Sequence, residues 1–178
     1  MPAPGQAWRH VVISTLGSWL PGDPRGWRSR GHKRHSSGDY KSPPPAGEYA
    51  LLHRYNERLS AKRIVIPRKA RADVGRAIVA LLCSEGHRLL VMSVGGMHAH
   101  LLVELPDNVR RIKAIVGHAK SKSSRAVKHI LPGSIWARGG RFEKIKDRAH
   151  HRNVYNYILT RQERGTWVWS YKDRPRCM

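Results

Sequence analysis

Two histidines separated by one residue are the side chains of this sequence with the clearest potential for chemistry. His98 and His100 stand in the stretch GGMHAHLLVELP at residues 95–106. On a β-strand, residues i and i+2 point to the same face, so a strand here would place the two imidazoles side by side. Two imidazole nitrogens can hold a divalent cation if a third ligand comes from elsewhere. The alternative is a pair of ordinary histidines on a half-exposed strand, because a lone His-x-His motif is a weak signal.

The charge of the chain is the strongest bulk signal. The sequence has 34 Lys and Arg against 12 Asp and Glu, a formal net charge of +22. Folding does not need such an excess of positive charge, and the repulsion between these charges opposes the compact state. Its usual use is to hold a polyanion, so we expect a nucleic acid as the partner.

Length and composition indicate one ordinary domain, since the chain has 178 residues and 40% of them are hydrophobic. No apolar run approaches the roughly 20 residues of a membrane span. The first residues lack the charged and apolar regions of a signal peptide, so we expect neither export nor a membrane partner. Cys83 and Cys177 do not form a disulfide framework, and a reducing cytoplasm is the simplest setting.

Hydrophobic periodicity predicts an alternation of strands and helices. The stripe of apolar residues at 70–86 is typical of an amphipathic helix, and the Gly95-Gly96 turn indicates a hairpin. The expected strands are residues 8–16, 87–94, 97–105, 134–137 and 141–146, and the expected helices are residues 49–60, 70–86, 107–131 and 147–164. Apart from the first helix, the βαββαβ order predicts a ferredoxin-like α+β sandwich, an antiparallel sheet with helices on one face.

A basic, proline- and glycine-rich insertion is expected at about residues 20–62, within a single domain of residues 1–178. Residues 28–48 hold few apolar side chains and cannot bury much surface. They are a candidate arm that closes on nucleic acid.

The helix expected at 107–131 carries a dense run of phosphate donors at residues 119–125, AKSKSSR. A charge run on a helix is usually only a solvated face, but here almost all the charges have one sign, which favours a track for phosphates. The residues that we expect to bind DNA are Arg110, Arg111, Lys113, Lys120, Lys122, Ser123, Arg125 and, beyond the helix, Arg138.

Taken in order, these motifs resemble the single-tyrosine HUH transposases, which include small insertion-sequence enzymes and the REP-associated tyrosine transposases. MHAHLLVELP is similar to the family's histidine-hydrophobic-histidine segment, and KSKSSR to its Lys/Ser-rich helix. IWARGG at 135–140 is similar to its Trp-x-Arg-Gly strand. VYNYI at 154–158 resembles the helix in which the nucleophile precedes an isoleucine. The resemblance covers about residues 65–165 and the first strand.

The resemblance implies a transposase that cleaves and rejoins single-stranded DNA, at hairpin-containing sites, through a 5′-phosphotyrosine intermediate. It implies that His98 and His100 bind Mg²⁺ or Mn²⁺ and that Tyr157 is the nucleophile, with Tyr155 as the competitor. At about 100° per residue the two tyrosines point to nearly opposite sides of a helix, so only one can face the histidines. Relatives act as dimers or as monomers, and a homodimer therefore stays open.

One departure from the family pattern concerns the third metal ligand. The family often supplies Gln or Asn one turn after the tyrosine, but that position is Arg161, which cannot ligate a cation. Gln162, water, and His150 or His151 are the open alternatives. The departure favours a second hypothesis, a domesticated, non-catalytic nucleic-acid-binding protein. A third hypothesis is a metal-dependent hydrolase without covalent chemistry.

Overall fold

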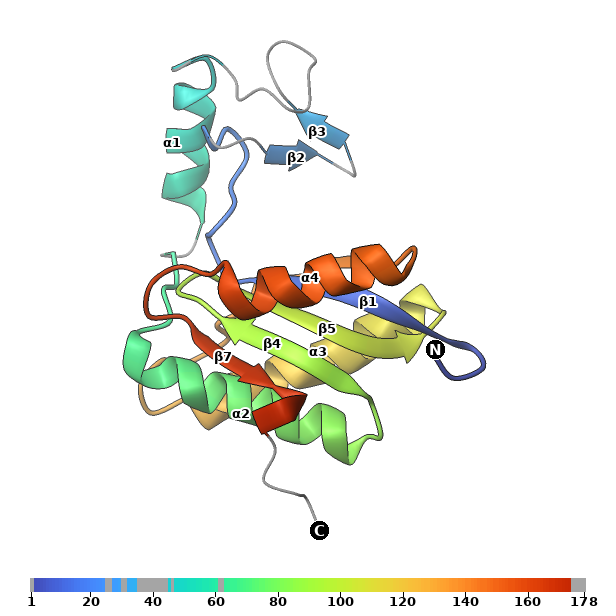
Figure 1. Ribbon diagram of the computed structural model, residues 1–178. Coiled ribbons are helices and arrows are strands. Elements are labelled where there is room, and N and C mark those ends of the chain that lie inside the picture. The colour runs from blue at the N-terminus through green and yellow to red at the C-terminus, as the bar shows by residue number, and fades with distance from the viewer. Residues whose placement is uncertain are drawn as a thin grey trace. The chain divides into compact units, whose positions relative to one another are not determined.

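The structure of the protein is a computed structural model, shown in Figure 1, that describes residues 2–24, 27–29, 32–34, 45, 47–60 and 63–173. The chain forms two compact units, and each is described by itself. The first comprises residues 1–15 and 65–178, and the second comprises residues 16–64. Most of the candidate arm at 28–48 lies outside the described residues.

The first unit is built on a five-stranded antiparallel sheet of order β6-β1-β5-β4-β7. The strands are β1 (Gln6–Ser14), β4 (Leu89–Val94), β5 (His98–Pro106), β6 (Arg141–Lys144) and β7 (Trp167–Ser170). β5 lies in the centre, where β1 pairs with it from Gln6 opposite Pro106 to Ser14 opposite His98. Because β5 has neighbours on both sides and cover on both faces, residues 99–105 are all buried.

Three helices cover this sheet: α2 (Arg68–Ser84), α3 (Val109–Ala126) and α4 (Arg148–Thr160). Figure 1 shows α2 and α3 together on one face and α4 on the other. Side chains of β7 show the same division. A Cβ on Gly75 of α2 would collide with the ring of Trp167, whereas the Ser170 hydroxyl is hydrogen-bonded to Tyr155 of α4. Residues 167 and 170 are three apart on a strand and so point to opposite faces.

The predicted ferredoxin-like α+β sandwich is confirmed, with one correction: we expected helices on one face, and they cover both. The reason is the apolar content of the second face. Val91 and Leu102 are paired across β4 and β5 and point to that face. Val154 and Ile158, one turn apart on α4, pack on them and complete a buried cluster.

Capping side chains begin two of the helices where we expected. Asn108 accepts a hydrogen bond from the backbone N–H of Arg111 at the start of α3, and Asp147 accepts one from His150 at the start of α4. The end of α3 differs, because the helix stops at Ala126 instead of continuing to residue 131. The strand expected at 134–137 is reduced to a single bridge between Thr15 and Trp136.

The second unit contains the helix α1 (Ala50–Leu59), which was expected, and a small antiparallel hairpin of β2 (Trp27–Ser29) and β3 (His32–Arg34). The preceding loop packs closely on α1, since a Cβ on Gly22 would come within 2.6 Å of the backbone nitrogen of His53. The short 3₁₀ helix η1 (Tyr171–Asp173) follows β7 in the first unit. Across the described ranges, no helix has the length and apolar character needed to cross a membrane.

Candidate functional site

The two histidines at the start of β5 lie side by side, as their spacing predicts. The ring centroids of His98 and His100 are 4.9 Å apart, with planes at 82°. His98 is half-buried and His100 is buried, with only 7% of its surface exposed. Both point to the face of the sheet that α4 covers, because His100 shares that face with Leu102.

Tyr157 on α4 meets this pair. Its ring centroid lies 5.5 Å from that of His100, with the planes at 86°, and its side chain is 41% exposed. The burial of Val154 and Ile158 orients α4 and turns Tyr157 toward the histidines. Tyr155 points elsewhere: its hydroxyl is 2.9 Å from the hydroxyl of Ser170 on β7. The structure therefore brings His98, His100 and Tyr157 together and gives Tyr155 a structural contact.

A third histidine, His10 on β1, joins the cluster and was missed by the sequence analysis. Its Nε2 lies 3.0 Å from Nδ1 of His100, and the two rings are stacked with centroids 5.3 Å apart. In this hydrogen bond one nitrogen donates and the other accepts, so Nδ1 of His100 is engaged and Nε2 is the nitrogen left for a ligand. The only signal in the sequence was a histidine next to the apolar residues 11–13 of an expected strand.

The electrostatics of the cluster keep its rings neutral. Burial, with smaller contributions from His98, His10 and Arg141, lowers the pKa of His100 to about 3. Burial also lowers the pKa of His98, against an opposing effect of the nearby Glu163 carboxylate. Burial and the positive charge of Arg141 lower the pKa of His10. Neutral imidazoles have the free lone pair that a cation requires, so these rings are chemically able to serve as metal ligands.

Most of the candidates for a third metal ligand make other contacts in the structure. Gln162 donates its side-chain amide to the carbonyl of Tyr157 at 2.9 Å, at the end of α4. The ring of His151 packs edge-on against Trp8 at 5.2 Å, and His150 Nδ1 accepts a bond from Lys146. Glu163, which the sequence analysis did not consider, is near enough to influence His98.

Two further observations concern the fit of a metal ion. Among the residues that the structure describes, no three His, Cys, Asp or Glu side chains are grouped to hold a metal. Ser93 lies opposite His100 in the pairing of β4 with β5, and its side chain is buried. Its hydroxyl has no hydrogen-bond partner among the residues that the structure describes. A polar group of this kind beside His100 is suited to a bound water or ion. The third ligand stays open.

The predicted DNA-binding residues lie mainly on α3, in the helix layer on the opposite face from Tyr157 (Figure 1). Six of them are exposed: Arg110, Arg111, Lys113, Lys122, Arg125 and Arg138. The other two, Lys120 and Ser123, hold the fold. Ser123 is buried and accepts a hydrogen bond from the Trp136 indole at 2.9 Å. Lys120 donates to the carbonyls of Ala137, at 2.9 Å, and Gly139.

Comparison with known proteins gives a limited structural likeness. No protein-family model matches the sequence, and no curated protein matches it. Among solved structures, the chain is similar to a REP-associated tyrosine transposase bound to a REP hairpin. The TM-score is 0.45 and the sequence identity 14%, over 89% of this chain and 67% of that chain. This likeness relates to the fold and leaves the role of each residue to be argued from its own contacts.

Proposed function

We propose that the protein is a transposase-type enzyme that cleaves and rejoins single-stranded DNA, preferably next to hairpins, through a covalent bond to Tyr157. One observation carries the proposal: the phenol ring of Tyr157 lies edge-on to His100, 5.5 Å between centroids, beside a second neutral imidazole. A hydroxyl nucleophile next to two metal-ligating side chains is the arrangement that phosphoryl transfer requires. The net charge of +22 supports a polyanionic substrate.

The proposed reaction exchanges one phosphoester for another. The Tyr157 oxygen attacks phosphorus, an O–P bond forms, and the bond from phosphorus to the 3′ oxygen breaks. The phenolic proton leaves to solvent, which reaches the 41% exposed side chain, and the 3′ oxygen takes up a proton. The covalent link retains the energy of the phosphodiester, so another 3′ hydroxyl can reverse the step without ATP.

His98 and His100 would hold the divalent cation, Mg²⁺ or Mn²⁺, with His10 orienting the His100 ring through the 3.0 Å hydrogen bond. The cation supplies Lewis-acid polarisation of the phosphate oxygens. The low pKa of His100, about 3, keeps its ring available for this role throughout the physiological pH range.

A second function is favoured by the end of α4. Arg161 occupies the expected ligand position, and the amide of Gln162 is bonded to the Tyr157 carbonyl. A chain that has lost its third ligand can still bind nucleic acid through its charge. The alternative is therefore a domesticated, non-catalytic nucleic-acid-binding protein of the same fold.

A covalent adduct separates the two functions. The protein is incubated with end-labelled single-stranded DNA that contains a hairpin, with Mn²⁺, and resolved on a denaturing gel. The proposal expects a shifted band with the wild type and with Tyr155→Phe, which is the matched control on the same helix, and none with Tyr157→Phe. A wild type that gives no adduct across a panel of hairpin substrates favours the non-catalytic alternative. An adduct that persists in Tyr157→Phe removes Tyr157 as the nucleophile.

A further inference from the structure

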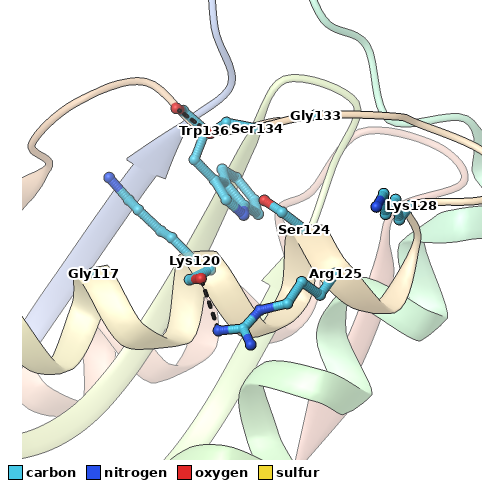
Figure 2. Close-up of a pocket in the computed structure, with 9 residues that line it drawn as sticks. Gly117, Lys120, Ser124, Arg125, Lys128, Gly133, Ser134 and Trp136 are labelled. Carbon is cyan, nitrogen blue, oxygen red and sulfur yellow. Dashed lines mark hydrogen bonds between the residues drawn. The ribbon is translucent and has the colours of Figure 1, made fainter.

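A hollow of about 560 Å³ lies between the second half of α3 and the segment at 133–136, in the helix layer away from Tyr157. Figure 2 shows Lys120, Arg125 and Lys128 coming from α3 and the turn after it, with Trp136 and Ser134 on the opposite wall. The volume is within the range of about 300–1,000 Å³ that is usual for ligand sites. The sequence predicts a phosphate track along this helix that includes Lys120 and Arg125, but it gives no indication of a concave site.

The walls of the hollow are held together by hydrogen bonds. The Trp136 indole donates to Ser123 at 2.9 Å, and the backbone N–H of Ile135 donates to the Ser124 hydroxyl at 3.4 Å. Lys120 reaches across from α3 to two carbonyls beyond Trp136. The bridge between Trp136 and Thr15 joins the same segment to the end of β1. A site with walls tied in this way needs little reorganisation to bind a ligand.

The lining of the hollow is suited to an anion. It contains three cationic side chains, Lys120, Arg125 and Lys128, and no carboxylate. Within the described part of the chain, neither Arg125 nor Lys128 forms an ion pair. The Arg125 guanidinium donates a hydrogen bond to the Ser121 hydroxyl at 3.0 Å. The Lys120 ammonium has three N–H donors and uses two of them on the carbonyls of Ala137 and Gly139, so Lys120 ties one wall of the hollow and adds positive charge. The hydroxyls of Ser121 and Ser124 accept hydrogen bonds from Arg125 and from the Ile135 backbone, and their own O–H groups can serve as neutral donors.

The aromatic residue of the hollow indicates which part of a nucleotide binds. Stacking of a base needs an exposed ring face, but Trp136 is only 4% exposed and its N–H is used by Ser123. The remaining groups are donors and positive charges, which match phosphate oxygens. We propose that this hollow is a binding site for a backbone phosphate of single-stranded DNA. The site rests on the proposed function only in taking DNA as the polyanion.

The test compares two pairs of charges in the same helix layer. Arg125→Gln with Lys128→Gln removes two exposed charges three residues apart at the hollow. Lys69→Gln with Arg76→Gln removes two exposed charges on α2, neither of which was expected to bind DNA. Affinity for a labelled single strand is measured by fluorescence anisotropy over a series of salt concentrations, and thermal unfolding verifies that each variant is folded.

We expect the hollow pair to weaken binding about tenfold or more and to reduce the slope of log K against log salt by about 0.7, the value for one lost phosphate contact on a single strand. The control pair should weaken binding by about threefold or less, through the general field alone. Equal losses in the two pairs would overturn the site.

A second variant tests the hollow without removing a charge from it. Ser121→Glu introduces a carboxylate into the lining, and Ala114→Glu introduces one on the exposed surface near the start of α3. The first should weaken binding at least about fivefold more than the second, because the new charge stands where the phosphate would lie. Indistinguishable effects of the two carboxylates count against the site.

Two further outcomes distinguish a failure of the proposed hollow from a failure of the proposed Tyr157 reaction. Saturable binding of inorganic phosphate to the wild type, combined with unchanged strand affinity in the hollow pair, assigns the hollow to a small free anion and overturns the proposal. The Tyr157 adduct is measured on the same preparations. A wild type with no adduct but a strong effect of the hollow pair removes the proposed reaction and supports this site, whereas an adduct with no effect of the hollow pair removes this site alone.

Discussion

The histidine cluster under α4 and the hollow beside α3 differ in how far their basic side chains are exposed to solvent. In the cluster, His10, His98 and His100 are wholly or partly buried and their pKa values are lowered, so the rings are neutral. In the hollow, Arg125 and Lys128 are exposed, whereas Lys120 is partly buried and burial lowers its pKa. Burial favours the neutral form of a base, which a metal ion needs, and exposure preserves the charge, which a phosphate needs.

The two regions also lie in different helix layers, on opposite faces of one sheet (Figure 1). Reaction and affinity therefore depend on separate sets of side chains in our proposals. A substitution in one region should leave the property of the other region almost unchanged.

The largest expected effect is the loss of cleavage in His98→Ala. Removing a metal ligand should lower the rate of adduct formation by about 10³-fold, since Lewis-acid stabilisation amounts to several kcal/mol and about 1.4 kcal/mol corresponds to a factor of ten. Affinity for single-stranded DNA should change by less than about threefold, because phosphate contacts dominate binding. The control is His129→Ala, at an exposed histidine just after α3. Parallel losses of cleavage and binding in His98→Ala would contradict the division into two regions.

The next effect concerns His10, which contacts His100 at 3.0 Å. His10→Phe keeps an aromatic ring on β1 but removes the hydrogen bond that orients His100, and such losses typically lower metal affinity by about 10- to 100-fold. Manganese titration followed by calorimetry measures this change, with His10→Gln as a variant that can restore part of the bond. The expectation is wrong if metal affinity is unchanged in both variants, or if His10→Phe mainly lowers DNA affinity.

The pH dependence of stability provides a third comparison. His100 has a pKa of about 3 in the folded chain against 6.5 as the ordinary value, so the unfolded chain binds a proton that the folded chain excludes. Stability is therefore full above pH 6.5 and is lost as the pH falls below it, by up to about 1.4 kcal/mol per pH unit. Urea unfolding at several pH values measures this slope.

His100→Gln should show a smaller decline in stability with falling pH than the wild type. His129→Gln, at an exposed histidine just after α3, is the control and should show the same decline as the wild type. A decline of the same size in His100→Gln would mean that burial of this ring does not penalise its protonation.

The smallest expected effect is structural and lies beside the hollow. Lys120→Met retains the aliphatic stem and removes the hydrogen bonds to the carbonyls of Ala137 and Gly139, which should lower the free energy of unfolding by about 1 kcal/mol. The adduct rate on saturating DNA should stay within about twofold of the wild type, since the cluster under α4 is untouched. Chemical denaturation and the adduct assay provide the two readings. Unchanged stability would show that Lys120 contributes charge alone.

Local periodicity accounts for most of the fold that we predicted. The i, i+2 rule placed His98 and His100 on one face, and the helical angle between positions 155 and 157 separated the two tyrosines. The placement of α4 was wrong because periodicity identifies the apolar side of a helix but not the face of the sheet that receives it. The predicted site was incomplete for the same reason, since the pairing of β1 with β5 brings His10 to His100, 90 positions away in the chain.

The sequence by itself determined the order of the elements, the shared face of His98 and His100, and the excess of positive charge, because each depends on residues close in the chain or on composition. Only the tertiary structure decided that Tyr157 meets these histidines, that His10 completes the cluster, and that part of the basic helix forms the wall of a hollow. These features depend on strand register and helix packing, which long-range burial selects and no local pattern encodes.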